Sequence, residues 1–278
     1  GCNCGGGLVS SGAADVRLPP LETINHLKVA KDSTLTIFAV EKAVEKATPI
    51  GACVLIKELP ADYCLSVKHL FMSLKEERGD TVYTAACRGR EECEEAIMVA
   101  HSNSQDLAIV RLRGEFSGVR ASLADVEPQA GLPIWVIGTP DGNIQSISYG
   151  VVSTRTRCAF EKPPSENCYR ISAIIHPGNS GGGVFDEWSR LVCVSQSIGN
   201  ETMPIIQFTP NGIEEVKGMF ANVQDPTDNR CISLPAIQNF LEAWEEIQAS
   251  ENPSLLKRFK KSMKLLRRQL DSFLELSL

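Results

Sequence analysis

The sequence predicts an all-β protein made of two six-stranded Greek-key barrels and followed by C-terminal α-helices. From Thr34 onward, short β-branched and apolar runs alternate with turns, a pattern typical of sandwiches and barrels. A polar, glycine-containing stretch from Arg113 to Gly131 divides these runs into two sets of about six. After residue 234 the apolar spacing changes to that of a helix.

The individual runs set the boundaries of the two barrels. Those of the first set are Thr34–Val40, Ile50–Ile56, Tyr63–Val67, Thr81–Ala86, Glu95–Ala100 and Leu107–Arg111. Those of the second set are Pro133–Ile137, Ser146–Ser153, Tyr169–Ile171, Gly183–Phe185, Leu191–Ser197, Ile205–Thr209 and Cys231–Leu234. We therefore expect a first barrel over residues 34–113, an inter-barrel linker over 114–131 and a second barrel over 132–234.

The two ends of the chain differ from the barrels. Residues 1–33 open on a Gly- and Ser-rich stretch that is typical of a flexible leader. Residues 235–250 have a helical pattern, and Pro235 occupies a favoured first-turn position. Residues 253–278 predict a basic amphipathic helical tail, with apolar residues three and four apart and seven basic against two acidic residues. This tail has three candidate roles: packing on the parent domain, homo-oligomerisation through residues 253–278, or attachment to an anionic membrane or nucleic acid.

Composition restricts the class of protein. Of the 278 residues, 43% are hydrophobic and 22% charged, which suits a globular protein with a sizeable core. The net charge of −6 argues against nucleic acid as the main partner. No run of 18 apolar residues occurs in the sequence.

Ten cysteines are many for a reducing cytosol. The sequence contains no CxxC pair, which argues against a zinc site or a redox motif. Candidate disulfide cysteines are Cys53, Cys64, Cys158, Cys168, Cys193 and Cys231. Cys158 and Cys168 bracket a Pro-rich loop, and Cys53 and Cys64 lie on consecutive strand-like runs. The sequence leaves their connectivity open, and free buried cysteines are the alternative.

The first residues suggest a location. Gly1-Cys2 followed by a Gly- and Ser-rich spacer is similar to the start of a bacterial lipoprotein, with Cys2 lipidated and tethering the chain to a membrane. This favours an exported protein of the bacterial envelope or periplasm, with a cytoplasmic or viral origin as the alternatives.

The most informative segment is His176-Pro-Gly-Asn-Ser-Gly-Gly-Gly183, which places Ser180 between glycines. A nucleophilic hydroxyl needs a sharp turn with bare backbone N–H groups beside it. The segment also fits the G-x-S-x-G elbow of α/β-hydrolases, which requires a histidine after the serine. All four histidines precede Ser180, so that class is excluded.

The remaining arrangement needs histidine, aspartate and serine in this order along the chain. His69 ends the strand-like run that starts at Tyr63, and Asp106 opens the apolar run 107–112. A partly buried aspartate at the edge of such a strand needs an N–H partner, which an imidazole supplies. His69, Asp106 and Ser180 are therefore the candidate catalytic residues.

With these residues in place, the chain resembles the trypsin-like serine peptidases, most closely the HtrA/DegP type, over about residues 34–245. The matching segments are Gly51–Ile56, Val67–His69, Gln105–Val110, Ile137–Pro140, Gly150–Ser153 and Pro177–Gly182. The resemblance implies a chymotrypsin-like double barrel with the triad between the barrels.

The family's roles apply at the matching positions. The resemblance implies that Ser180 is the nucleophile, His69 the general base and acid, and Asp106 the group that fixes the imidazole. It implies an oxyanion hole at Gly178, Asn179 and Ser180, in which Asn179 shapes the turn. It also implies a substrate pocket formed by Ile174, Ser195, Gln196 and Ser197. Because position 174 is not acidic, we expect cleavage after a small or aliphatic residue.

Three positions depart from the family pattern. Asn179 stands where digestive members have an aspartate that pairs with a new N-terminus, so we expect no activation by N-terminal insertion. Lys68 replaces a small residue and Gly183 replaces a common proline. No PDZ-like segment follows the peptidase region. No metal or organic cofactor is implied.

Three functional hypotheses follow. The first is an active serine endopeptidase that works through an acyl-enzyme. The second is a catalytically silent scaffold that keeps the fold and binds a partner protein. The third is a peptidase that processes a viral polyprotein.

Overall fold

The structure is a computed structural model that describes residues 21–251, except for 44–45, 79–80, 90–91, 159–165, 197–200, 210–211 and 224–228. Its helices are α1 (Leu21–Ser33), α2 (Lys68–Arg78) and α3 (Leu234–Glu251), with a short 3-10 turn η2 (Pro140–Gly142). The strands before the linker are β1 (Thr34–Glu41), β2 (Lys46–Val54), β3 (Tyr63–Ser66), β4 (Val82–Arg88), β5 (Glu92–His101) and β6 (Ala108–Leu112). Those after it are β7 (Pro133–Gly138), β8 (Ser146–Thr156), β9 (Cys168–Ile171), β10 (Gly183–Phe185), β11 (Leu191–Gln196), β12 (Glu201–Thr209), β13 (Gly212–Val223) and β14 (Asn229–Ser233).

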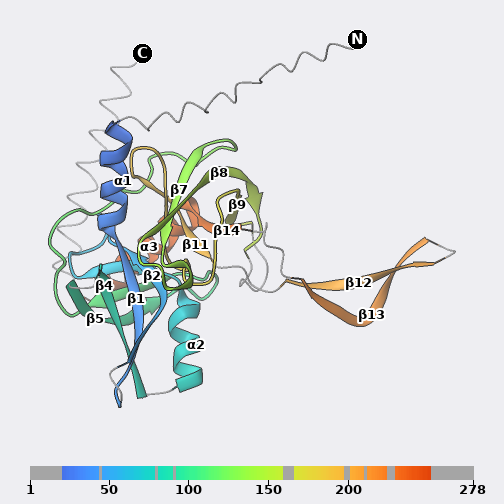
Figure 1. Cartoon of the computed structure of the whole chain (residues 1–278), viewed down its shortest axis with the longest axis horizontal. Coiled ribbons are helices and arrows are strands. Elements are labelled where there is room, and N and C mark those ends of the chain that lie inside the picture. Colours follow the sequence, from blue (N-terminus) through green and yellow to red (C-terminus); the bar gives the residue numbers. More distant parts are fainter. Residues whose placement is uncertain are drawn as a thin grey trace, which may run out of the picture.

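Two closed antiparallel barrels make up the body of the molecule (Figure 1). The first has the strand order β1-β2-β3-β6-β5-β4, and the second has the order β10-β11-β14-β9-β8-β7. Each barrel is closed, so that every strand is paired on both sides and neither barrel has an open edge. The predicted fold class, two six-stranded barrels with a C-terminal helix, is confirmed.

The inward residues of each barrel form its core. In the first barrel, buried side chains alternate along the strands, as on β4, where Thr84 and Ala86 are buried between less buried neighbours. This core includes Leu35, Ile37, Leu55, Val110 and Leu112. The second core includes Ile134, Val136, Tyr169, Ile171 and Val192.

A third cluster joins the two barrels and α3. It contains Val54, Leu65 and Ile109 from the first barrel, Ile137, Phe185, Val194 and Ile232 from the second, and Ile237 and Leu241 from α3. The ring of Trp244 on α3 packs against Tyr63 of the first barrel at 5.5 Å between centroids. The barrels therefore share a continuous apolar interface, and α3 spans it.

The N-terminal segment differs from the expected flexible leader. Residues 21–33 form α1, whose end is fixed by the hydroxyls of Ser33 and Thr34, both donating to the Ala30 carbonyl at 2.9 Å. The Gln145 amide donates to the carbonyls of Lys31 and Thr34 at 2.9 and 3.1 Å. This tertiary docking is invisible to composition, so the prediction of flexibility up to residue 33 was wrong for residues 21–33.

A second difference lies between β11 and β14. The run Ile205–Thr209 was expected in the second barrel, but β12 pairs with β13 in a two-stranded sheet outside both barrels. Figure 1 shows this hairpin projecting from the body. The strand Gly212–Val223 was not predicted, because its glutamates and lysine interrupt the apolar alternation.

Four disulfides occur among the described residues. They are Cys53–Cys64, Cys87–Cys93, Cys158–Cys168 and Cys193–Cys231. The six candidate cysteines are therefore all bonded, which removes the alternative of free buried thiols. Cys87–Cys93, across the β4–β5 hairpin, was not foreseen.

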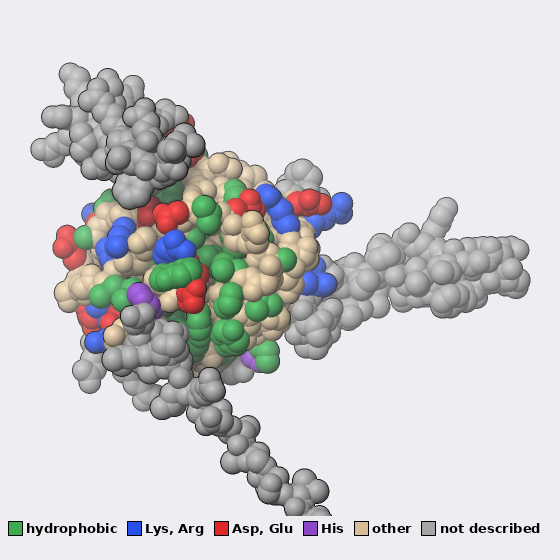
Figure 2. Space-filling view, turned by 90° about the horizontal axis from the view of Figure 1, so that it is seen from above, with side chains coloured by type: hydrophobic (Ala, Val, Ile, Leu, Met, Phe, Trp, Pro, Cys, Tyr) green, Lys and Arg blue, Asp and Glu red, His purple; other side chains and the backbone are tan. Residues whose placement is uncertain are grey.

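The predictions for Cys2 and for the tail 253–278 lie outside the described residues. None of the described helices is long and apolar enough to span a bilayer. On the face shown in Figure 2, hydrophobic side chains gather in the middle, with acidic and basic side chains interspersed around them.

Candidate active site

Ser180 lies at the end of a tight turn. The carbonyl of His176 accepts a hydrogen bond from the Asn179 N–H at 3.0 Å, and Gly178 has φ +97°. A type II turn requires a positive φ at its third position, which favours glycine, and often has proline at its second. The sequence Pro177-Gly178 meets both. We call residues 176–182 the serine loop.

Both barrels hold the serine loop in place. The Ser180 carbonyl accepts the Ala52 N–H of β2 at 2.8 Å, and the Gly181 N–H donates to the Ser195 carbonyl of β11 at 2.9 Å. Gly181 has φ +80°, and a Cβ there would overlap the Ala52 carbonyl oxygen. Only glycine allows the loop to approach β2 this closely. Ser180 is thereby fixed at the junction of the two barrels.

His69 is carried by α2 instead of ending a strand, so the predicted strand end was wrong at this residue. β3 stops at Ser66, and α2 begins at Lys68. The Lys68 N–H still donates to the Asp106 carbonyl at 3.4 Å, continuing the β3–β6 register in which Ser66 faces Ala108. The antiparallel pairing of β3 with β6 therefore brings the two catalytic candidates together across the chain.

A continuous chain of hydrogen bonds connects the three candidates. His69 Nδ1 lies 2.6 Å from Asp106 Oδ2, and His69 Nε2 lies 3.2 Å from Ser180 Oγ. With the proton on Nδ1 donated to the carboxylate, Nε2 is free to accept the hydroxyl proton. The His69 side chain is 23% exposed, so a substrate can reach it, whereas the Asp106 side chain is 1% exposed.

Three N–H groups satisfy the buried Asp106 carboxylate. Oδ1 accepts the His69 backbone N–H at 2.9 Å, and Oδ2 accepts both His69 Nδ1–H and the Gln196 amide at 3.1 Å. A buried carboxylate needs such donors to remain ionised. The Lys68 ammonium donates to the Ser102 carbonyl at 2.9 Å and so closes the loop that precedes Asp106.

The serine loop also presents backbone donors. The Asn179 N–H is used by the turn, whereas no acceptor within the described residues takes the Gly178 N–H. The Asn179 side chain is buried against Gly138, where a Cβ would overlap Asn179 Oδ1. Asn179 thus supports the turn from behind, and Gly178 is more exposed than either Asn179 or Ser180.

The four predicted pocket residues have mixed placements. The Ile174 side chain is 55% exposed and not at the base of an enclosed pocket, whereas Ile175 is buried. The Ser195 hydroxyl donates to the carbonyls of Asn179 and Gly182 in the serine loop. The Gln196 side chain is turned toward Asp106. Ser197 lies outside the described residues.

The trypsin-like peptidase domain matches residues 51–194. The chain belongs to this family. Strands β3 to β10, the linker and the serine loop fall within the match.

One protein is similar to this trypsin-like chain in sequence and two solved structures are similar to it in fold. The serine endoprotease DegS of Haemophilus influenzae is 28% identical over 147 residues, 52% of this chain and 41% of DegS. The match thus spans less than half the length of that relative. The active form of the Rv3671c protease of M. tuberculosis has TM-score 0.57 and 16% identity, over 80% of this chain and 85% of the other. The HtrA-type protease AlgW, solved with a tripeptide, has TM-score 0.53 and 17% identity, over 82% and 62%. The two structures are similar in fold.

The residues that the sequence did not reveal are those that hold this trypsin-like site from behind. Gln196 was expected to line a pocket, and nothing local in a buried strand indicates that its amide reaches Asp106. Ser66 was not singled out, although its hydroxyl donates to the Ala52 carbonyl at 2.7 Å and so fixes the strand that binds Ser180. Within the described ranges, no group of three or more His, Cys, Asp or Glu side chains is placed to bind a metal ion.

Proposed function

We propose that this protein is a serine endopeptidase of the HtrA-like type, with Ser180 as nucleophile, His69 as general base and acid, and Asp106 as the group that orients His69. The observation that carries the proposal is the unbroken hydrogen-bond chain from Asp106 through His69 to Ser180 Oγ. Nucleophile, base and orienting carboxylate in mutual hydrogen-bond distance are what acyl transfer requires.

The first half of the reaction makes an acyl-enzyme. Ser180 Oγ attacks the carbonyl carbon of the peptide bond, and His69 Nε2 takes its proton. The imidazolium that forms is stabilised by the Asp106 carboxylate, which remains ionised. His69 then gives the proton to the leaving amine, so that the C–N bond breaks and the acyl group stays on Ser180.

The second half regenerates the enzyme. Water attacks the ester carbonyl, and His69 Nε2 accepts the proton from that water. Collapse of the second tetrahedral intermediate returns the proton to Ser180 Oγ and releases the acid. In both halves the oxyanion lies against the N–H groups of Gly178 and Ser180, with Asn179 holding the turn. The type II turn supports this assignment, as does the Gly178 N–H, which finds no acceptor in the part of the chain that the structure describes.

The substrate class is a polypeptide, with cleavage after a small or aliphatic residue. The apolar side chain at position 174 supports this, because a preference for Lys or Arg needs an acidic group near the pocket. The exposed side chain of Ile174 and the backbone of the strand end at Ser195, Gln196 and Ser197 are proposed to border the substrate.

The cellular location is proposed from the cysteines. Four disulfides among the described residues favour an oxidising compartment, as an exported envelope or periplasmic protein provides. Membrane tethering through lipidated Cys2 and oligomerisation through residues 253–278 are part of the same proposal and rest on sequence alone.

A fluorophosphonate probe tests the proposal, because it reacts only with an activated serine. We expect the wild-type protein to be labelled and to cleave casein, and Ser180→Ala to do neither. Ser117→Ala removes an exposed serine outside the site and serves as the control, with labelling equal to wild type. No labelling of the wild-type protein, or equal labelling of Ser180→Ala, would refute the peptidase mechanism.

A further inference from the structure

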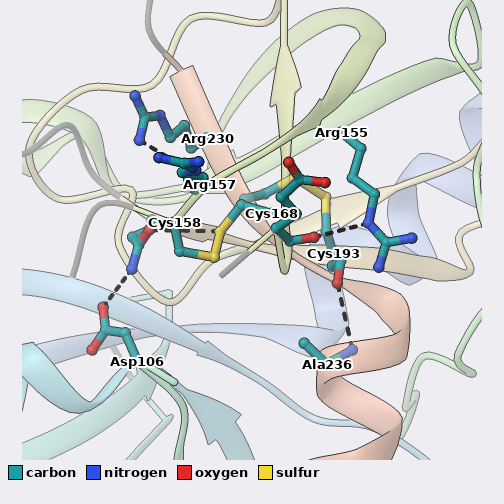
Figure 3. The surroundings of a disulfide bond; sticks show 12 residues. Asp106, Arg155, Arg157, Cys158, Cys168, Cys193, Arg230 and Ala236 are labelled. Atoms are coloured by element: carbon teal, nitrogen blue, oxygen red, sulfur yellow. Dashed lines mark hydrogen bonds between the residues drawn. A yellow bond between two sulfur atoms is a disulfide. The ribbon is translucent and has the colours of Figure 1, made fainter. Parts of the chain in front are cut away.

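The side chain of Gln196 lies between the triad and a disulfide. Gln196 is the last residue of β11 and is 1% exposed, and its Nε2 donates to Asp106 Oδ2 at 3.1 Å. Its Oε1 lies 3.8 Å from the Sγ of Cys168, which is bonded to Cys158. Figure 3 shows Asp106 and this disulfide with one amide side chain between them, connected to both by dashed lines.

The chemistry of the neighbours fixes which end of the amide faces which group. An ionised carboxylate can only accept, so the amide nitrogen has to face Asp106 and the amide oxygen has to face the sulfur. A sulfur in a disulfide has no hydrogen, so the contact with Cys168 is van der Waals packing and not a hydrogen bond. The disulfide therefore fills the space behind the amide.

We propose that Gln196 is a positioning residue for the triad and that the Cys158–Cys168 disulfide holds its side chain against Asp106. The inference rests on the proposed peptidase function and adds two groups outside the triad, the Gln196 amide and the disulfide, that hold Asp106 in place. The Gln196 side chain touches neither the substrate nor the reacting atoms in this scheme, because it is turned toward Asp106. It acts through the carboxylate that orients His69.

The Gln196 amide, the Cys158–Cys168 disulfide and the Asp106 carboxylate are all buried, which makes the contact between them important. Gln196, Cys158, Cys168 and Asp106 are all at most 4% exposed, so water is not at hand to replace a missing donor. Without the Gln196 amide, Oδ2 keeps only the bond to His69 Nδ1 and Oδ1 the bond to the His69 backbone N–H, so every remaining donor to the carboxylate comes from His69 and its orientation is less firmly fixed. The imidazole ring would follow, and Nε2 would lose its alignment with Ser180 Oγ.

Strand pairing in the second barrel fixes the position of the disulfide relative to Gln196. Cys168 is the first residue of β9 and pairs with Ile232 of β14, while Gln196 pairs with Arg230 of the same strand. Cys168 and Gln196 are therefore held on either side of β14 by backbone hydrogen bonds. The bond to Cys158 prevents the Cys168 side chain from turning away from the amide.

Gln196→Met is the direct test, because methionine keeps the size of glutamine and has no N–H donor. We expect kcat for a peptide substrate to fall about tenfold, or about 1.4 kcal/mol, with KM unchanged. The strongly deshielded proton NMR signal of His69 Nδ1–H should move upfield or broaden, and the thermal unfolding midpoint should stay near that of wild type. Equal kcat and an unmoved proton signal would refute the role of Gln196.

The disulfide is tested through non-additivity. We expect Cys158→Ser with Cys168→Ser to lower kcat in the wild-type background and to change it little when Gln196 is already methionine. Cys87→Ser with Cys93→Ser, in the first barrel, is the matched control and should leave kcat unchanged. If the serine pair does not fold, Cys158→Ala with Cys168→Val replaces it. An equal fold-change in both backgrounds would refute the coupling.

The outcomes separate this inference from the proposed function. If the wild-type protein is inert toward substrate and fluorophosphonate, the peptidase proposal fails first. In that case the NMR signal of His69 Nδ1–H still tests the contact between Gln196 and Asp106, since it is observed without turnover of a substrate. If the wild-type protein is active and Gln196→Met matches it, only the positioning role fails.

Discussion

Arg120 ties the inter-barrel linker to the loop before β3, and its removal should destabilise the protein strongly. Its guanidinium donates to the carbonyls of Ile56 at 2.9 Å, Leu59 at 3.3 Å, Pro60 at 2.8 Å, Ala61 at 2.9 Å and Tyr63 at 2.8 Å. Arginine alone has five N–H donors in one rigid plane. This single side chain therefore holds the loop that leads into β3 and on to His69.

The magnitude follows from counting these bonds. Three of them, to Ile56, Leu59 and Tyr63, are partly buried, and two are exposed. Nη2 has two hydrogens for the three carbonyls of Leu59, Pro60 and Tyr63, so the longest of these bonds, to Leu59 at 3.3 Å, shares a hydrogen and is not counted separately. With about 1 kcal/mol for each of the other two partly buried bonds and about half of that for each exposed one, Arg120→Met should lower the free energy of unfolding by about 3 kcal/mol. Arg120→Lys keeps the charge but has only three donors, so we expect it to lose about half as much.

Urea unfolding followed by tryptophan fluorescence measures the loss. Arg113→Met is the matched control, because the Arg113 side chain is 79% exposed and makes one ion pair, with Glu95. An exposed ion pair contributes about 0–1 kcal/mol, so this control should stay close to wild type. If Arg120→Met and Arg113→Met lose the same free energy, the five-carbonyl contact does not stabilise the loop, and the reasoning fails.

Two further perturbations test other parts of the structure. Gly138→Ala places a methyl group 2.9 Å from Asn179 Cα and in overlap with its side-chain oxygen, so the turn has to shift and kcat should fall about 10²-fold in a steady-state assay; an unchanged kcat would contradict the supporting role of Asn179. Burial on α3, with Glu242 and Glu58 nearby, raises the pKa of Glu245 above its usual value, so the folded state holds this proton more tightly than the unfolded state. The contribution of Glu245 to the free energy of unfolding is therefore lowest above the pKa of the folded state and rises as the pH falls through that pKa. Glu245→Gln should raise the unfolding temperature at pH 7 and leave it unchanged at pH 3, where both states are protonated; equal midpoints at pH 7 would refute this.

The barrels could be predicted because local pattern and burial agree there. Runs such as Leu107–Arg111 are short, apolar and bounded by polar turns, and their counterparts in the structure are buried barrel strands. The order of His69, Asp106 and Ser180 along the chain was enough to select three residues that the fold brings within hydrogen-bond distance. This worked because the other three histidines could be set aside: His26 precedes the first strand, His101 is too near Asp106 in the chain, and His176 lies on the loop of the serine itself.

What the sequence missed depends on contacts between distant residues. The strand-like run at residues 63–70 continues into His69 by composition, but α2 begins at Lys68, and hydrophobic spacing over so few residues does not separate the two. Gln196 meets Asp106 across 90 residues, and no local signal gives the direction of a buried amide. The docking of α1 depends on Gln145 in the same way.

The pairing of Gln196 with Arg230 has a consequence for engineering the chain. The hairpin β12–β13 is an excursion whose two ends lie on adjacent, hydrogen-bonded strands of a closed barrel. A short reverse turn from β11 to β14 would bridge the same gap without altering the barrel's strand order. The hairpin is thus a module that can be removed or exchanged, and the residue at its entry is the one that contacts Asp106.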